Sequence, residues 1–334
     1  MIIKSESGYD TISVVVPCYN ESDGLIQFHH RLGNALRAAS VAAEIIYVND
    51  GSADDTFDVI KSLQSSDNRV GLIDLSRNFG KEAALTAGID HAHGDAVIVI
   101  DADLQDPPEC IPDMVDAWRL GNDVVAMKRG DRSTDTRFKR ISALWFYKIL
   151  SRLSDVRIPE NVGDFRLLSR RAVDALKAMP ERNRYMKGLF AWVGFKTIEI
   201  EYKRDPRFVG DSKWPLLKLI GLALDGITSF SIAPLRLASI AGGLVAVGAM
   251  IYGTSMLAKT LLFGDSVAGF PTLIVVITFL GGAQLMAIGL LGEYVGRLLV
   301  ESKQRPLYFV DSVDLPALAK SNAADHLRRR AAPV

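Results

Sequence analysis

Short apolar runs alternate with amphipathic stretches over the first third of the chain. Runs rich in Val and Ile end at Pro, Asn, Asp or Gly, and they predict five strands, at residues 12–16, 44–48, 70–75, 96–100 and 123–127. The stretches between them predict helices at residues 22–39, 54–64 and 81–92. Strands that are apolar on both faces and joined by helices form mainly parallel sheets covered by helices. The pattern therefore predicts an α/β domain that binds ligands at the carboxyl ends of its strands.

Two long segments near the end of the chain, residues 237–258 and 266–292, contain no charged residue. At about 1.5 Å per residue, each is long enough to cross a hydrocarbon core about 30 Å thick. Their short linker makes them a hairpin, with Arg236 before the first segment and Arg297 and Lys303 after the second. The positive-inside bias then places both flanks in the cytoplasm, at the inner membrane. Two buried soluble helices are the alternative, but such helices rarely lack a polar stripe.

These patterns divide the chain into four parts. They are a cytoplasmic α/β domain at 1–213, an amphipathic segment at 214–231, two membrane helices within 232–300 (about 236–258 and 268–293) and a cytoplasmic tail at 301–334. The amphipathic segment is expected to lie in the membrane interface or to pack on the α/β domain. Glycines in both apolar segments suit close helix contact in lipid: Gly242, Gly243, Gly248, Gly281, Gly282 and Gly289.

The composition excludes several classes of protein. The 334 residues include 39 Lys and Arg against 39 Asp and Glu, so the chain lacks the basic excess of a generic nucleic-acid binder. Two cysteines cannot build a disulfide framework or a four-cysteine zinc site. We therefore expect a membrane and small-molecule partners, and no nucleic acid.

An acidic motif, Asp101-Ala102-Asp103-Leu104-Gln105-Asp106, directly follows the predicted strand at residues 96–100. Two carboxylates at a strand end can hold a divalent cation against a diphosphate, because Mg²⁺ favours one or two carboxylates together with phosphate oxygens and water. Gln105 adds a neutral oxygen to the same turn. A polar loop that caps the next helix is the alternative interpretation.

Other polar residues follow the remaining predicted strands. Asp50, in an Asn-Asp-Gly-Ser turn, could accept hydrogen bonds from a base or a ribose, although an Asx-turn explains the same residues. Glu21 is expected at the same edge of the sheet. Lys81 follows a glycine turn and begins a helix, which suits phosphate binding, with a surface turn as the alternative.

A second set of cations is suited to an acceptor phosphate near the membrane. These residues flank apolar stretches, and a lipid phosphate needs nearby cations and apolar walls for its chain. A basic patch that only attracts anionic lipids is the alternative. The candidates are the cations Arg129, Lys139, Arg140, Arg207 and Lys213, together with the hydroxyl of Ser212.

The motifs V-V-P-x-Y-N-E, N-D-G-S, R-N-x-G-K, D-A-D-L-Q-D-P-P, G-D-F-R-L and R-x-x-G-x-S-K-W occur in this order. Together they resemble family 2 glycosyltransferases of the polyprenyl-phosphate branch, which includes dolichol-phosphate mannose synthase and the bactoprenol glucosyltransferases. The resemblance covers residues 10–310 and implies a GT-A fold with a mainly parallel, Rossmann-like sheet.

The resemblance also implies roles for single residues. Pro17, Glu21 and Asp50 would hold the nucleoside, and Lys81 and Asp101 belong to the same nucleotide-sugar site. Asp101, Asp103 and Gln105 would hold Mg²⁺ or Mn²⁺. The catalytic candidates are Asp103 and Asp164, the latter in the G-D-F-R-L motif.

The resemblance implies an enzyme that transfers a hexose, with inversion, from a nucleotide-sugar to polyprenyl phosphate on the cytoplasmic face of the membrane. It also implies that the protein is a homotetramer. UDP-glucose and undecaprenyl phosphate are the preferred substrates. GDP-mannose, UDP-GlcNAc, UDP-galactose or a UDP-aminoarabinose derivative remain alternative donors. A processive polysaccharide synthase and a non-catalytic membrane scaffold are the other hypotheses.

Overall fold

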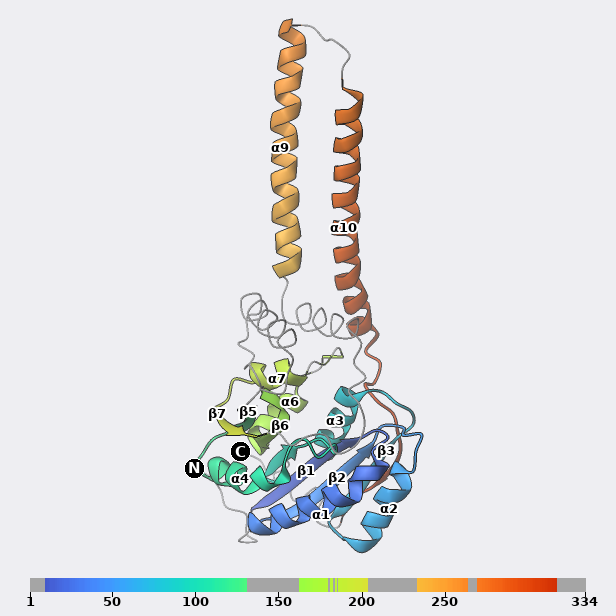
Figure 1. Ribbon diagram of the computed structural model, residues 1–334, viewed down its shortest axis with the longest axis vertical. Helices are drawn as coiled ribbons and strands as arrows, with labels where there is room; N and C mark the ends of the chain where they lie inside the picture. The colour runs from blue at the N-terminus through green and yellow to red at the C-terminus, as the bar shows by residue number, and fades with distance from the viewer. Residues whose placement is uncertain are drawn as a thin grey trace, which may run out of the picture.

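The computed structural model describes residues 10–130, 162–179, 181–182, 184, 186–203, 233–263 and 269–316. An α/β domain forms one end of this part of the molecule, and two long helices rise from it side by side (Figure 1). The α/β class expected from the alternating pattern is therefore confirmed.

The described strands form one eight-stranded sheet in the order β7-β5-β6-β4-β1-β2-β3-β8. Strands β4, β1, β2 and β3 pair in parallel, as do β5 and β7, whereas β6 and β8 run antiparallel to their neighbours. The five predicted strands are all present, but β6, β7 and β8 were not predicted. The strands are β1 (Thr11–Cys18), β2 (Ala42–Asn49), β3 (Val70–Leu75), β4 (Ala96–Val99), β5 (Val124–Arg129), β6 (Val162–Ser169), β7 (Thr197–Tyr202) and β8 (Val310–Asp314).

Helices cover both faces of the sheet. Alternating side chains of β1 show why: Val14 and Val16 pack with α1, α2 and α4, whereas Val15 packs with α3, α6 and α7. These helices are α1 (Ser22–Ala38), α2 (Thr56–Ser66), α3 (Lys81–Asp90), α4 (Ile111–Arg119), which follows the short 3₁₀ turn Pro108–Cys110, α6 (Arg170–Lys177) and α7 (Met186–Trp192).

The C-terminal part of the chain returns to the sheet. Strand β8 pairs antiparallel with β3 and closes that edge. The Tyr308 hydroxyl donates to Asp90 Oδ2 at 2.9 Å, and the Phe309 ring lies 6.2 Å from the ring of Phe79. We expected a cytoplasmic tail at 301–334 that turns polar after Pro306. Within this range β8 instead joins the sheet, and Tyr308, Val310 and Leu315 pack against the core.

The two long helices are α9 (Ala233–Phe263) and α10 (Phe270–Lys303). Large apolar side chains on both are exposed, including Leu244 at 70% and Met286 at 78%. Among the described residues, the stretch Phe279–Lys303 of α10 is long and apolar enough to cross a membrane, whereas α9 offers only the shorter apolar stretch Ile240–Tyr252. The expected pair of membrane helices is thus supported for α10 and remains a prediction for α9.

The glycines of α9 and α10 whose surroundings the structure describes have open space beside them. A Cβ atom built at any of them meets no other heavy atom within 4 Å outside its own helix backbone. The expectation that these glycines suit close helix contact in lipid therefore stays a prediction.

Candidate active site

The polar loops expected at one edge of the sheet do lie there. Strands β1, β2 and β4 are adjacent and parallel, so the loops that follow their carboxyl ends share one edge. This edge carries Pro17, Glu21, Asp50 and Asp101. The topology therefore confirms that the loops lie together, while the roles of these residues stay predictions.

Asp50 holds the turn that precedes α3. Its buried carboxylate accepts hydrogen bonds from the backbone N–H groups of Phe79, at 2.7 Å, and Gly80, at 2.9 Å. Burial raises the pKa of Asp50, although these two hydrogen bonds oppose the change. Asp50 thus fixes the backbone from which Lys81 projects.

Gly51 is required by a close approach of two loops. Its φ is +62°, and a Cβ atom there would lie 2.4 Å from the backbone carbon of Arg77 and 2.5 Å from the nitrogen of Asn78. The Asn-Asp-Gly-Ser and Arg-Asn-Phe-Gly-Lys motifs are therefore packed backbone against backbone, which explains why the first of them needs glycine.

Lys81 lies between two carboxylates. Its ammonium is 2.7 Å from Asp101 Oδ2 and 2.7 Å from Asp164 Oδ2. In the antiparallel register, Val99 of β4 pairs with Arg166 of β6. Two residues after Val99 and two residues before Arg166, Asp101 therefore comes opposite Asp164. The structure thus joins three residues that sequence analysis assigned to the donor site and the reacting centre.

Each of these carboxylates keeps one unpaired oxygen. Asp101 Oδ1 and Asp164 Oδ1 are buried and have no hydrogen-bond partner among the described residues. An unsatisfied carboxylate oxygen is costly unless a cation or donor group reaches it. The geometry therefore favours an incoming cation or polar ligand at this point.

The charges around the pair act differently on its two members. Burial raises the pKa of Asp101, and the neighbouring charge of Asp164 adds to this while Lys81 opposes it. Burial alone would raise the pKa of Asp164 as well, but Lys81, Lys187 and Arg166 outweigh it and hold that pKa well below its ordinary value. Asp164 is therefore an anion at neutral pH and a poor proton acceptor.

Asp103 and Gln105 lie in the tight turn after β4. Asp103 Oδ1 accepts a hydrogen bond from the Gln105 backbone N–H at 3.1 Å, and Leu104 between them has a φ of +61°. Both side chains are partly exposed at the same edge as Asp101. They are placed where they could add oxygens to a metal held by Asp101.

The residues fit an open metal site better than a closed one. No group of three or more His, Cys, Asp or Glu side chains that could hold a metal occurs in the part of the chain that the structure describes. Two carboxylates and an amide would leave coordination positions for diphosphate oxygens and water, as Mg²⁺ and Mn²⁺ commonly require. The unpaired Asp101 Oδ1 agrees with such a site.

Arg129 is the only one of the six acceptor-site candidates within the described residues. It is the last residue of β5. The distance from its guanidinium nitrogen to a Cβ atom built at Gly163, the residue before Asp164, is 3.6 Å. Arg129 also bonds the hydroxyl of Tyr202, which donates to the buried Asp106 at 2.5 Å. Arg129 is therefore held beside the carboxylate pair. The other candidates lie outside the described residues: Lys139, Arg140, Arg207, Ser212 and Lys213.

Comparison with known proteins identifies the family. The family model described as "Glycosyl transferase family 2" matches residues 13–177. The "Prophage bactoprenol glucosyl transferase homolog" of Escherichia coli (strain K12) is 50% identical over 302 residues, which are 90% of this chain and 99% of that protein. The chain belongs to glycosyl transferase family 2. The "Bactoprenol glucosyl transferase" of Shigella phage SfV is also 50% identical, over 90% of this chain and 97% of that protein.

A more distant relative and a solved structure extend the comparison. The "Putative glycosyltransferase CsbB" of Bacillus subtilis (strain 168) is 39% identical over 95% of this chain and 97% of that protein. A crystal structure of glucosyl-3-phosphoglycerate synthase from Mycobacterium tuberculosis aligns with 66% of this chain and 76% of that one, at 20% identity and a TM-score of 0.48.

Two charged residues that act on Asp164 were missed by sequence analysis. Arg166 is buried, and its guanidinium lies 3.9 Å from the centre of the Phe190 ring. Glu82 accepts a hydrogen bond from the Met186 backbone N–H, and its second oxygen has no partner. Arg166 could have been noticed, because it lies two residues after Asp164 and so shares its face of β6. Glu82 gave no such signal beyond its place after Lys81.

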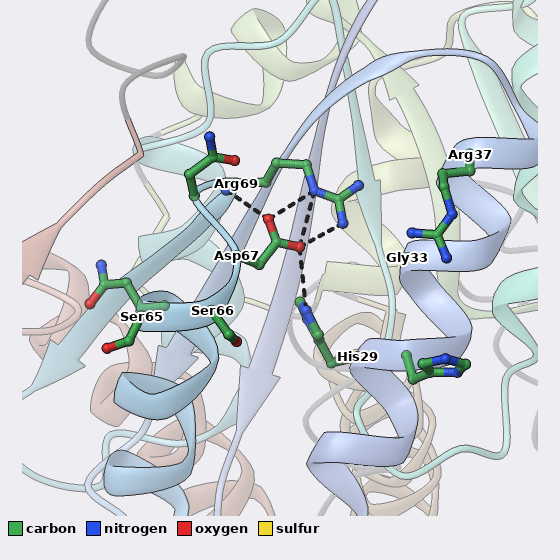
Figure 2. Close-up of a pocket in the computed structure, with 10 residues that line it drawn as sticks. His29, Gly33, Arg37, Ser65, Ser66, Asp67 and Arg69 are labelled. Carbon is green, nitrogen blue, oxygen red and sulfur yellow. Dashed lines mark hydrogen bonds and ion pairs between the residues drawn. The ribbon is translucent and has the colours of Figure 1, made fainter.

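A hollow of about 700 Å³ in this family 2 enzyme lies away from Lys81, Asp101 and Asp164, between α1 and the segment that precedes β3. His29, Gly33 and Arg37 of α1 line one side, and Asp67 and Arg69, which precede β3, line the other (Figure 2). Arg69 pairs with Asp67 through Nε at 2.9 Å, and His29 Nε2 approaches the same carboxylate at 3.4 Å. Asp67, the only carboxylate that lines this hollow, is thus already paired with Arg69 and His29.

Proposed function

We propose that this glycosyltransferase moves glucose from UDP-glucose to undecaprenyl or another polyprenyl phosphate at the cytoplasmic face of the membrane. The proposal rests on Lys81 joining Asp101 and Asp164 at the ligand-binding edge, in a chain 50% identical to proteins named bactoprenol glucosyl transferase. The product, a polyprenyl-phosphate glucose, would serve as a sugar donor for glycosylation of the cell envelope.

The acceptor needs little help from a base. A phosphate monoester has a second pKa of about 6, so its attacking oxygen is already largely anionic at pH 7. Asp164, an anion beside Lys81, is suited to orient the sugar or the acceptor. A single in-line displacement inverts the anomeric centre, so an α-linked donor gives a β-linked lipid product.

The departing diphosphate needs positive charge. In our proposal Asp101, Asp103 and Gln105 hold Mg²⁺ or Mn²⁺, which acts as a Lewis acid on the diphosphate when bound. Lys81 adds a second cation from the start of α3. Pro17, Glu21 and Asp50 complete the nucleoside side of the site, where Asp50 acts by fixing the loop before Lys81.

Contacts between the site and α10 favour a lipid acceptor. The Arg182 backbone N–H donates to Glu301 Oε1, in the last turn of α10, at 2.8 Å. A few residues further along the chain, the Met186 backbone N–H donates a hydrogen bond to Glu82. The positive charge of Lys187, the next residue, lowers the pKa of Asp164. The carboxylate pair is thus linked through a short segment to the helix that is long enough to cross a membrane. In our proposal the lipid phosphate is received by Arg129, Lys139, Arg140, Arg207, Ser212 and Lys213.

Alternative functions remain testable. The same chemistry with GDP-mannose, UDP-GlcNAc, UDP-galactose or a UDP-aminoarabinose derivative would differ only in the donor pocket. A processive synthase would give long products, and a scaffold would give none. We also propose a homotetramer, which light scattering of the detergent-solubilised protein would check.

The deciding experiment measures transfer of radiolabelled sugar from each nucleotide-sugar to undecaprenyl phosphate. We expect UDP-glucose to be used best and Asp103→Ala to lower the rate on the order of 10²–10³-fold, because it removes charge stabilisation of the leaving group. Asp113→Ala, on the exposed side of α4, is the matched control and should transfer normally. Transfer by Asp103→Ala at the wild-type rate would refute the metal role.

Asp164→Asn, assayed alongside, tests the role of Asp164. We expect a smaller loss, about 10–100-fold, because a positioning group and not an indispensable base is removed. A loss as complete as that of Asp103→Ala would contradict this assignment.

A further inference from the structure

Lys81 occupies the point where the two carboxylates of the site converge. Its ammonium contacts Asp101 Oδ2 and Asp164 Oδ2, both at 2.7 Å, and the second oxygen of each carboxylate has no partner among the described residues. One ammonium group therefore contacts both carboxylates, while Lys187 and Arg166 act on Asp164 alone. A divalent cation would find two unpaired oxygens here but also a positive charge directly between the carboxylates.

We propose that Lys81 is the resident counter-ion of Asp101 and Asp164 in the donor-free enzyme, and that the diphosphate of the donor draws its ammonium away so that a divalent cation takes over Asp101. The inference rests on the proposed function only in naming a nucleotide diphosphate as the incoming anion. The same movement frees Asp164 to contact the sugar or the acceptor.

The surroundings of Lys81 allow this movement. The turn before it is fixed, since Asp50 holds the Phe79 and Gly80 N–H groups. The side chain itself is 43% exposed, whereas those of Asp101 and Asp164 are 23% and 13% exposed. Nothing lies within 4 Å of a Cβ atom built at Gly80. A rigid base thus carries a flexible, partly exposed arm that can swing without any change in the backbone.

Three binding effects follow from this arrangement. Without the donor, Lys81 competes with the divalent cation for Asp101. With the donor, the diphosphate stabilises Lys81 in its other position and so favours the cation. Because coupling between two ligands is reciprocal, the cation must also strengthen diphosphate binding. Lys81 thereby makes cation and donor bind together instead of separately.

The test is a titration of the full-length protein in detergent with Mn²⁺ alone, followed by electron paramagnetic resonance of free Mn²⁺. We expect Lys81→Gln to bind Mn²⁺ on the order of tenfold more tightly than wild type, because a competing charge close to the carboxylates is gone. Lys81→Arg keeps the charge and should bind as weakly as wild type. Lys187→Gln is the matched control, since it removes an equal charge that acts on Asp164 from α7, and it should change the affinity less than about threefold.

Repeating the titration with uridine diphosphate measures the coupling. In wild type, uridine diphosphate should strengthen Mn²⁺ binding by a factor on the order of tenfold greater than in Lys81→Gln. Should Lys81→Gln not give a folded protein by circular dichroism, Lys81→Met removes the same charge on an unbranched side chain and takes its place.

Two results would overturn the inference. One is Mn²⁺ binding by Lys81→Gln no tighter than by wild type. The other is an equal gain in Lys187→Gln, which would reveal a general charge effect. Because Mn²⁺ alone is the probe, a failure of glucose transfer would refute the proposed function without altering either result.

Discussion

Glu82 is a partly buried carboxyl group beside Asp164. Burial, together with the charge of Asp164, raises its pKa from 4.5 to about 7. Between these two values the folded protein keeps a proton that the unfolded chain has lost. The stabilisation is therefore complete below about pH 4.5 and is lost as the pH rises through 7.

Glu82→Gln removes this titration, so its thermal stability relative to wild type should increase from pH 5 to pH 8. Thermal unfolding in detergent at a series of pH values measures the difference in Tm. Glu109→Gln is the control: Arg31 bonds that carboxylate at 2.8 and 2.7 Å and holds its pKa below the ordinary value. The difference in Tm between Glu109→Gln and wild type should hardly change from pH 5 to pH 8. If this difference changed with pH equally in Glu82→Gln and Glu109→Gln, the assignment to Glu82 would be contradicted.

At the scale of elements, strand β8 supports the turn that presents Lys81. The Ser76 backbone N–H donates to the Phe309 carbonyl at 3.0 Å, and the Phe309 ring contacts Phe79. Arg77 also lies 4.2 Å from the centre of the Phe79 ring. The segment that leaves α10 is thereby packed against the loop whose backbone Asp50 holds.

Phe309→Ala should loosen this loop. Removing one ring contact of a half-exposed aromatic costs about 0.5–1.5 kcal/mol. We expect faster hydrogen exchange at Phe79 and Gly80 and a several-fold lower transfer rate. Ser312→Ala, at an exposed position of β8, the strand that follows Phe309, should change neither. Unchanged exchange in Phe309→Ala would show that β8 only closes the sheet edge.

At the scale of the whole molecule, exposed apolar side chains are concentrated on α9 and α10, which project from the α/β domain (Figure 1). Soluble monomeric proteins rarely expose large continuous apolar surfaces, so we expect these helices to lie in an apolar environment. The chain returns to the α/β domain after α10, since β8 follows α10 and pairs in the sheet. A hairpin that crosses the membrane twice agrees with this connectivity.

Cysteine labelling in intact cells tests the hairpin. In a variant without Cys18 and Cys110, a cysteine at Ser266, between the two helices, should react with an impermeant maleimide from outside. A cysteine at Ser302, near the end of α10, should react only after the membrane is opened. Labelling of both positions, or of neither, from outside would contradict the two-span topology.

The local pattern of the sequence was sufficient for the elements. The strands β1 to β5 and the helices α1 to α3 were predicted because the period of apolar residues follows from backbone geometry. The motifs at strand ends also predicted which edge carries the chemistry, since parallel strands share one carboxyl edge. Strand β6 escaped prediction because its motif mixes Asp164 and Arg166 into an otherwise apolar run. Strand β8 lies after a long helix, and the pattern of residues within it does not indicate that it pairs with β3.

By itself, the sequence determined the α/β class, the apolar helices and the acidic and glycine-containing motifs, because periodicity and turn chemistry act over a few residues. Only the tertiary structure decided how these motifs interact. Lys81 reaches carboxylates 20 and 83 residues further along the chain, and Asp50 reaches amides 29 and 30 residues away. Such partners are set by strand order and register, which depend on the packing of the whole sheet. The sequence thus supplied the charges, and the fold determined which of them meet.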